Sequence, residues 1–447
     1  MMLSYRAPLT QIVILGMASL MTSGMHSAYF SLKFANGATG QSTTVISTGG
    51  SPFYWSAVIA AFLGGGLLNI IKPKHQVFVG GLSYSLYIAL SAIIQQSPPP
   101  SPTATIVQPI ASVLLGVGTG LLGSAQAALV MIYPTEDRKA SYFATLWLLI
   151  CLGPAMGDGM AFLLDSVNPK FTVTTSTSAA FAMITFFGSF WALSMCDPST
   201  IIREDGTAVN PPEVGQISSE LVQLGRLLKS PRLALLLLYL VTSNYFYYWQ
   251  STAINVHYFS LRTVHFNSVG FWLAQGVGAW LMAWILDSNR PRRTRAVIGL
   301  VVVLASCCVV WSGGLLYQFL AYNDVLPQAG ADLFGLGSTP NAAAVSILYV
   351  LMGAVDAMFQ AFAFWLVGAL TNDYATLARF GGYLKSMQTL GVTLSWALGS
   401  AGQVRPSDQC IVIVVLICLS LVAAYVVILA LQDTSKAADA ALLEESK

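Results

Sequence analysis

Twelve apolar stretches, each long enough to cross a bilayer, occupy nearly all of this 447-residue chain. A bilayer core of about 30 Å requires about 20 apolar residues per helix, and only 9% of the residues here are charged. Backbone N–H and C=O groups in lipid must pair within their own segment, so each stretch is predicted to be a helix. The sequence therefore predicts an all-α, multi-pass membrane protein. The predicted spans are residues 10–32, 53–71, 77–94, 104–132, 139–165, 178–196, 233–257, 265–287, 295–321, 342–370, 380–402 and 409–432.

One long polar segment divides these spans into two groups of six. It begins as a Pro-containing linker and continues, from Ser218 to Lys229, with apolar residues at helical spacing. This pattern predicts either a short amphipathic helix along the inner membrane face or an ordinary connector helix. The predicted parts are a first six-helix bundle, a linker, a second six-helix bundle and a polar tail, with bounds 1–196, 197–232, 233–432 and 433–447.

Basic residues are unevenly distributed between the two sides of the membrane. With the N-terminus inside, seventeen of the 21 Lys and Arg residues fall in inner segments and four in outer segments. Positive charge favours the cytoplasmic side, so we expect both termini to be cytoplasmic. The basic cluster at 290–295 lies between two hydrophobic spans, which favours a topology anchor over a nucleic-acid patch. No nucleic-acid partner is expected.

The same cluster follows an acidic residue at the end of the eighth span. Asp287, Arg292 and Arg293 are predicted to form a gate on the inner face that holds one conformation. The second span ends in a similar way, with Asn69 followed by a basic loop, which indicates a weak internal repeat.

An acid near the centre of the tenth span is the strongest candidate for a functional residue. An Asp at mid-membrane costs about 2.5–3.5 kcal/mol on insertion scales and usually faces the bundle interior. Asp356 occupies such a position, and Tyr349 and Gln360 share its helical stripe. This pattern indicates a substrate contact or a proton-coupling group, with a hydrogen-bonded clamp between helices as the alternative. No Lys or Arg is expected deep in a span, which leaves His26 as the candidate partner.

The seventh span carries a second polar stripe. Asn244, Tyr248 and Asn255 line one side of it, among several aromatic residues. Aromatic surfaces with convergent amides suit an organic ligand. The alternative is packing together with an aromatic belt at the outer interface.

Four further polar residues within spans are weaker candidates. Asp158 lies in the outer third of the fifth span and serves either the site or a solvated cavity mouth. His26, on a polar face of the first span, is either a proton relay or a neutral histidine bonded to a neighbouring helix. Gln126 on the fourth span and Gln388 on the eleventh add amide groups.

The chain carries no motif for enzymatic chemistry. It has no Walker loop, no zinc motif and no catalytic-triad spacing, and its six cysteines show no metal-ligand spacing. We therefore expect no cofactor, no bound metal and no enzyme activity.

Six spans, a linker and six spans resemble the major facilitator superfamily, whose two similar halves surround a midplane site. Three segments also resemble the UNC-93-like family, especially its fungal branch. They are AQAALVMIYPTEDRKASYFATLWLLICLG at 125–153, SNYFYYWQSTAINVHYFSLRTVHFNSVGFWLAQ at 243–275 and DAMFQAFAFWLVGALTNDYATLARFGGYLKSMQTLGVTLSWALGS at 356–400. The resemblance implies a central cavity lined by spans one, four, seven and ten.

Two functions fit this resemblance. The first is a secondary transporter of a small organic solute, and one specific version is an exporter of a fungal secondary metabolite. The second is a non-transporting adaptor that binds another membrane protein. In both cases the chain is integral to the membrane and contacts lipid, with plasma membrane and endomembranes left open.

Overall fold

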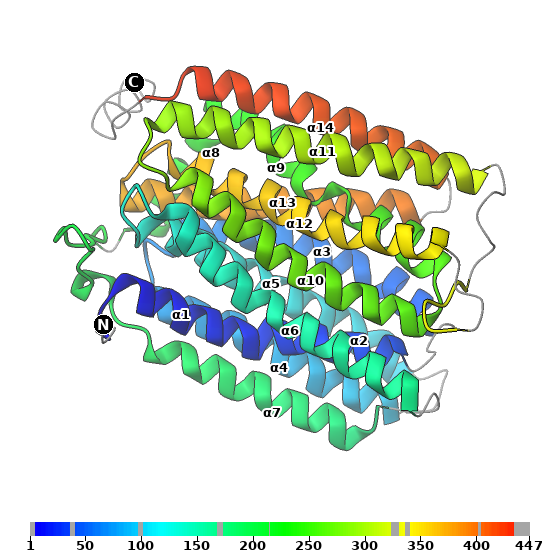
Figure 1. The fold of residues 1–447 in the computed structure, drawn as a ribbon. Helices are drawn as coiled ribbons and strands as arrows, with labels where there is room; N and C mark the ends of the chain where they lie inside the picture. Colours follow the sequence, from blue (N-terminus) through cyan, green and yellow to red (C-terminus); the bar gives the residue numbers. More distant parts are fainter. Residues whose placement is uncertain are drawn as a thin grey trace.

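The structure, a computed structural model, describes residues 5–35, 41–96, 102–167, 173–213, 215–322, 330–335, 340–400 and 404–432. These residues form an all-helical bundle, and the β structure within them is limited to two isolated bridges. Figure 1 shows the long helices side by side, with the start of α1 and the end of α14 at one end. We call this the terminal end and the opposite one the far end.

The helices before the linker form the first half. Several of them begin at proline, which suits the first helical turn because its missing N–H would have no partner there. The first span is interrupted by a π-helical segment, η1. The elements are α1 (Pro8–Ser19), η1 (Leu20–Gly24), α2 (Met25–Ala35), α3 (Gln41–Leu67), α4 (Pro73–Gln96), α5 (Pro102–Ile132), α6 (Lys139–Val167) and α7 (Thr175–Trp191).

The helices after the linker form the second half, and its first span also contains a π-helical segment, η4. The elements are α9 (Pro231–Tyr245), η4 (Trp249–Val256), α10 (Leu261–Leu286), α11 (Arg292–Tyr322), α12 (Pro340–Gly368), α13 (Tyr374–Ser400) and α14 (Pro406–Leu429). Between the halves, the linker contains α8 (Ile217–Leu227), which packs on α3 and buries Glu220 and Leu224.

Nine helices within the described ranges are long and apolar enough to cross a membrane. The remaining predicted spans correspond to α3, to α9 with η4, and to α13. The seventh span is divided by its π-helical segment, and α13 carries Arg379 and Lys385. The predicted all-α membrane class is confirmed.

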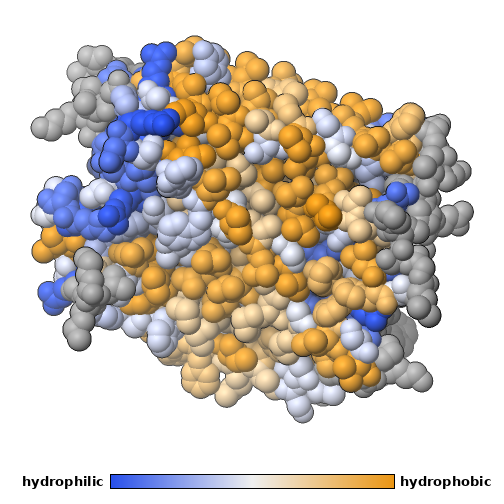
Figure 2. Space-filling model, viewed as in Figure 1, coloured by the Kyte–Doolittle hydropathy of each residue, from blue (hydrophilic) through white to orange (hydrophobic). Residues whose placement is uncertain are grey.

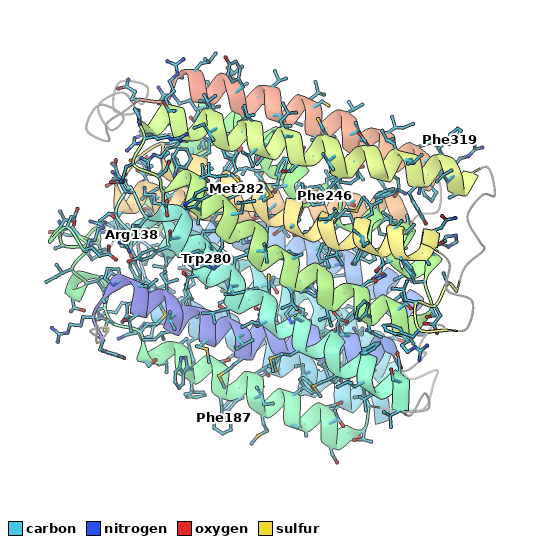
Figure 3. The ribbon with its side chains drawn as sticks, in the orientation of Figure 1. Arg138, Phe187, Phe246, Trp280, Met282 and Phe319 are labelled. Carbon is cyan, nitrogen blue, oxygen red and sulfur yellow. The ribbon has the colours of Figure 1, made fainter. Side chains whose placement is uncertain are left out.

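The outer surface is apolar over most of its height. Figure 2 shows a broad hydrophobic band, with hydrophilic residues gathered mainly at the terminal end. In Figure 3 the side chains of Phe187 and Phe319 point away from the bundle, and they are 56% and 64% exposed. A band of this extent is suited to contact with lipid.

Several helix pairs join the two halves, among them α5 against α13, and two of these pairs contrast in their chemistry. The first, α3 against α13, is a contact between backbones: a Cβ on Gly65 would lie 2.9 Å from Gly382 Cα, and one on Gly382 would lie 2.6 Å from Gly65 N. Small residues allow such close approach. We call this pair the glycine seam.

The second pair, α6 against α10, is joined by polar side chains. The Trp147 indole donates to Gln275 Oε1 at 2.9 Å, and Asp158 Oδ1 lies 3.0 Å from His265 Nδ1. We call this pair the polar seam. The two seams frame the centre of the bundle, where the candidate site lies.

Candidate functional site

Asp356 lies near the middle of α12 and is 1% exposed. It is twelve residues from Gly368, which places it about 18 Å from the terminal end of the helix. Its carboxylate accepts a hydrogen bond from Tyr247 Oη at 2.8 Å and another from Gln360 Nε2 at 3.3 Å. Tyr247 lies between α9 and η4, where the sequence interpretation named its neighbours Asn244 and Tyr248 instead.

Gln360 joins the tenth span to the seventh and the eleventh. Its amide nitrogen also donates to the Ser243 carbonyl at 3.0 Å and to Asn244 Oδ1. Its amide oxygen accepts a hydrogen bond from Gln388 Nε2, which also donates to Ser243 Oγ at 3.2 Å. The structure thus brings Asp356, Gln360, Asn244 and Gln388 into one hydrogen-bonded group.

Lys385 completes this group. Its Nζ donates to Gln388 Oε1 at 3.1 Å and lies 5.7 Å from the ring centroid of Trp147 and 5.5 Å from that of Phe364. Its methylene chain lies against Gly123 of α5. We define the central cluster as Asp356, Gln360, Gln388, Lys385, Asn244 and Tyr247.

The expectation that no lysine lies deep in a span is wrong. The predicted eleventh span began at residue 380, but α13 begins at Tyr374, so Lys385 is eleven residues into the helix, or about 16 Å. His26 does not take that role. Its ring packs edge-on against Tyr84 and Tyr87 of α4, with centroids 5.3 and 5.4 Å away.

Two predicted residues belong to a second polar group nearer the far end. Asn255 donates to the Val264 carbonyl at 3.1 Å and accepts a hydrogen bond from Asn267 at 3.0 Å. The Tyr349 ring stacks on Phe271 at 4.9 Å and its hydroxyl also contacts the Asn255 side chain. Tyr349 shares a helix face with Asp356 but bonds to this separate group.

Two other candidates lie elsewhere in the bundle. Tyr248 packs against Trp396, with ring centroids 5.0 Å apart. Gln126 donates to Ser19 Oγ at 2.8 Å and so joins α5 to α1 within the first half. Neither contacts the central cluster directly.

Asp158 is 6% exposed, so it is not the solvated carboxylate that its position near the outer end suggested as an alternative. Its partner His265, 1% exposed, escaped the sequence interpretation because the eighth span was predicted to begin there. The helix α10 begins at Leu261, which places the imidazole inside the bundle, with Asp165 Oδ2 3.8 Å from its other nitrogen.

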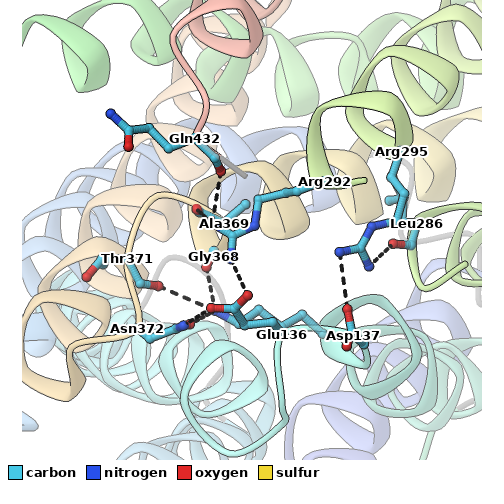
Figure 4. Close-up of polar contacts among 11 residues, drawn as sticks. Glu136, Asp137, Leu286, Arg292, Arg295, Gly368, Ala369, Thr371, Asn372 and Gln432 are labelled. Carbon is cyan, nitrogen blue, oxygen red and sulfur yellow. Dashed lines mark hydrogen bonds and ion pairs between the residues drawn. The ribbon is translucent and has the colours of Figure 1, made fainter. Parts of the chain in front are cut away.

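A network of charges joins the two halves at the terminal end (Figure 4). Glu136, in the loop after α5, pairs with Arg292 at the start of α11 and accepts a hydrogen bond from Asn372. Arg295 Nη2 lies 3.2 Å from Asp137. Neither acid was named from the sequence.

Asp287 makes its hydrogen bonds to the first turn of α6, and Arg295 of the network acts on it electrostatically. Its carboxylate accepts hydrogen bonds from the backbone N–H groups of Ala140, at 3.1 Å, and Ser141, at 2.7 Å. Burial raises the pKa of Asp287, and the hydrogen bonds from Ser141 oppose that rise. Arg293 lies exposed on α11. The gate remains a prediction, with Glu136 and Asp137 added to it.

Three relatives place the chain among known proteins, although no family model matches it. UNC93-like protein 1 of Arabidopsis thaliana is 30% identical over 88% of this chain and 84% of its own length. An UNC93-like protein of Schizosaccharomyces pombe is 29% identical over 89% and 77%. Notoamide biosynthesis cluster protein O′ of Aspergillus versicolor is 21% identical over 65% and 62%.

Solved structures agree on the fold. The outward conformation of the major facilitator superfamily transporter FucP superposes with a TM-score of 0.61 at 13% identity, over 95% of this chain and 99% of FucP. The proton:xylose symporter XylE superposes with a TM-score of 0.65 at 11% identity, over 93% and 94%. The chain thus has the major facilitator superfamily fold, and its sequence shows that it belongs to the UNC93-like family.

Proposed function

We propose that this protein is a secondary-active transporter of a small organic solute, without enzyme activity, and that the solute binds at the central cluster. The observation that carries this proposal is that a buried acid, Asp356, is linked through two glutamines to a lysine, Lys385, halfway across the bundle. Ionisable groups at that depth are costly and mark transport pathways in membrane proteins.

The cluster lies where a solute would contact both halves. Asp356, Gln360 and Lys385 belong to the second half, whereas Trp147 under the ammonium group belongs to α6 of the first. Lys385, Trp147 and Tyr247 retain partial exposure despite their depth, so they border space that a solvent-sized molecule reaches. A site shared by two halves suits alternating access, in which one half rocks against the other.

The terminal-end network supplies the corresponding barrier. Arg292 with Glu136, and Arg295 with Asp137, join the second half to the first, and Lys139 of α6 donates to Asn372 Oδ1 at 2.8 Å. Opening this end requires all three contacts to break. The described conformation is therefore closed at the terminal end, which we propose faces the cytoplasm because it carries most of the basic residues.

Similar proteins give two indications about the solute and its coupling. FucP and XylE are described as proton symporters of sugars, which supports coupled secondary transport. The name of the Aspergillus versicolor relative links it to a biosynthetic gene cluster, which supports the export of a secondary metabolite as one version. Lipids are the expected surroundings.

Metabolite profiling of cells and medium tests the proposal. Cells expressing the protein should redistribute at least one organic compound across the membrane, and Asp356→Asn should abolish that redistribution at matched protein levels. Asp408→Asn, an exposed acid in the first turn of α14, is the control and should transport normally. If no compound depends on the protein, or if Asp356→Asn transports normally, the proposal fails and a non-transporting adaptor with a membrane-protein partner becomes the better explanation.

A further inference from the structure

The ammonium group of Lys385 has more hydrogen-bond donors than its neighbours have acceptors for it. An ammonium has three N–H donors, and in the described part of the chain one of them has a hydrogen-bond acceptor, Gln388 Oε1. The rest of its surroundings are the ring faces of Trp147 and Phe364. Ring faces attract a cation but do not replace a hydrogen-bond acceptor. The side chain is also partly exposed, so the protein does not enclose it completely.

The hydrogen bonds between Lys385 and Asp356 all run in one direction. Lys385 donates to Gln388, Gln388 donates to Gln360, and Gln360 donates to Asp356. Two amides therefore separate the cation from the anion, and the aligned dipoles couple the two charges without direct contact. The carboxylate influences the lysine but does not occupy its free donors.

We propose that the transported solute is an organic anion, a carboxylate with an apolar body, and that it binds Lys385 when Asp356 takes up a proton. This inference rests on the proposed transport function. The proton comes from water on the side from which the solute enters and goes to an Asp356 carboxylate oxygen. The solute's negative charge then replaces that of Asp356 as the counter-charge of Lys385.

Charge balance is the physical reason for this coupling. A buried group with net charge is unfavourable unless it is paired. Lys385 with ionised Asp356 has no net charge, and so does Lys385 with a bound carboxylate and protonated Asp356. Binding of the anion without the proton leaves one negative charge in excess, and protonation without the anion leaves one positive charge in excess. Proton and anion therefore bind together.

The other titratable groups near Asp356 do not supply a competing charge at neutral pH. They are Tyr247 from the segment after α9, Cys151 from α6 and Tyr349 from α12 itself, in addition to Lys385 from α13. Phenol and thiol groups are ordinarily neutral below about pH 8. Asp356 and Lys385 thus carry the charge of the cluster.

The apolar body of the solute is inferred from the rings around the ammonium group. Phe143 stacks on Trp147 with centroids 5.1 Å apart and contacts Phe364 at 4.6 Å. The two phenylalanines are buried, whereas Trp147 is partly exposed. A partly exposed ring beside a single cation suits a ligand that is charged at one end and apolar at the other. Benzoate is a minimal probe of this chemistry, and benzamide has nearly the same shape without the charge.

Thermal unfolding of the purified full-length protein tests the inference, because a ligand that binds the folded state raises the unfolding temperature further as its concentration increases relative to its Kd. Benzoate should stabilise the wild type at about pH 5.5 and less at about pH 7.5, since a larger fraction of the Asp356 carboxyl group carries a proton at the lower pH. Asp356→Asn should bind benzoate equally at both pH values. Lys385→Met should weaken binding by about tenfold or more, and Lys385→Arg should retain it.

Lys229→Met is the matched control, because Lys229 is exposed beyond the end of α8. It should bind benzoate as the wild type does. The inference is overturned if benzamide stabilises as well as benzoate, if benzoate stabilises none of these proteins, or if Lys385→Met binds normally.

Uptake of labelled benzoate into proteoliposomes, driven by a proton gradient, separates this inference from the proposed function. Lys385-dependent binding without uptake would support the anion site and contradict transport. Transport of a neutral or cationic solute that is unaffected by Lys385→Met would support transport and contradict the anion site.

Discussion

The glycine seam and the polar seam join the same two halves by opposite means. At the glycine seam, Gly65 and Gly382 bring two backbones together with no side chain between them. At the polar seam, Trp147, Gln275, Asp158 and His265 are joined through side-chain groups. A backbone contact tolerates almost no change in separation, whereas hydrogen-bonded side chains can exchange partners as helices move. The glycine seam is thus suited to act as a pivot and the polar seam as a latch.

The two seams are counterparts in the internal repeat, since they pair spans two with eleven and eight with five. Each seam has a corresponding contact at the terminal end. Asn69, after α3, donates to the Ala375 carbonyl at the start of α13, at 3.2 Å. Asp287, after α10, accepts from the start of α6. The helix-end residues noticed in the sequence therefore have equivalent positions, while the chemistry along the seams has diverged.

The largest effect is expected from adding one methyl group to the glycine seam. Gly382→Ala would place Cβ 2.6 Å from Gly65 N, an atom of the backbone that cannot move aside locally. Overpacking of this kind costs about 3 kcal/mol or more. The thermal unfolding temperature in detergent should fall accordingly.

Gly159→Ala is the matched change on α6, where a Cβ would meet Val269 at an ordinary 3.8 Å. It should leave stability unchanged or slightly raised. If both variants lower the unfolding temperature equally, the two seams do not differ in the way proposed.

Loss of the Asp158 carboxylate should have the next largest effect. Asp158→Leu removes the partner 3.0 Å from His265 Nδ1, and a buried polar group left in this way costs about 2 kcal/mol. The double variant with His265→Leu should recover part of that loss, because neither group is then left without its partner. If the double variant costs the sum of the two single variants in thermal unfolding, the pair is not coupled and the latch is wrong.

A smaller, pH-dependent effect is expected where α8 meets the glycine seam. Glu220 accepts hydrogen bonds from Arg379 at 2.8 and 2.7 Å and from Asn69 at 3.1 Å. Burial alone would raise the pKa of Glu220, but these hydrogen bonds outweigh it and hold the pKa below its usual value. The contact therefore stabilises the fold above the ordinary glutamate pKa of about 4.3 and is lost as pH falls through the lower folded value.

Glu220→Gln should cost about 1 kcal/mol near neutral pH and nothing in strong acid. Unfolding curves of both proteins across that pH range measure the difference. If the difference in stability between the two proteins stays constant on acidification, the carboxylate charge has no part in the contact.

The smallest effect concerns the helix-end acid of the polar seam. Asp287→Asn removes a negative charge from the first turn of α6, where it interacts with the helix dipole, at a cost of about 0.5 kcal/mol. It should also shift the balance between inward-facing and outward-facing forms, measured as spin-label distances across the terminal end. Unchanged distances would restrict Asp287 to a local cap and leave the gate to Glu136 and Asp137.

Hydropathy predicted the helical class and the location of most spans because lipid imposes one rule on every residue of a span. Hydropathy misplaced Lys385 because it applies this polarity rule to charged residues at helix ends as well. The charge of Arg379 led the predicted span to begin at residue 380, yet α13 begins at Tyr374 and so continues toward the terminal end, which places Lys385 deeper. Charged residues at helix ends hide the true length of the helix from any scale based on polarity.

The sequence also could not predict how each helix is rotated about its own axis, and so which neighbour each of its faces contacts. Tyr349, Asp356 and Gln360 do share one face, but contacts with neighbouring helices assign Tyr349 to the group around Asn255 and the other two to the central cluster. His26 likewise faces α4 instead of the centre. These assignments depend on residues far apart in sequence, and a single helix contains no information about them.

The π-helical segments in the first span of each half also have a mechanical consequence. Leu20–Gly24 and Trp249–Val256 differ in sequence but interrupt equivalent spans. A π-bulge holds one extra residue in a widened turn, and returning that turn to α geometry would rotate everything beyond it by about 100° around the helix axis. The outer portions of these two spans can therefore rotate about the helix axis while their inner portions stay fixed. An unbroken helix such as α12 does not have this torsional freedom.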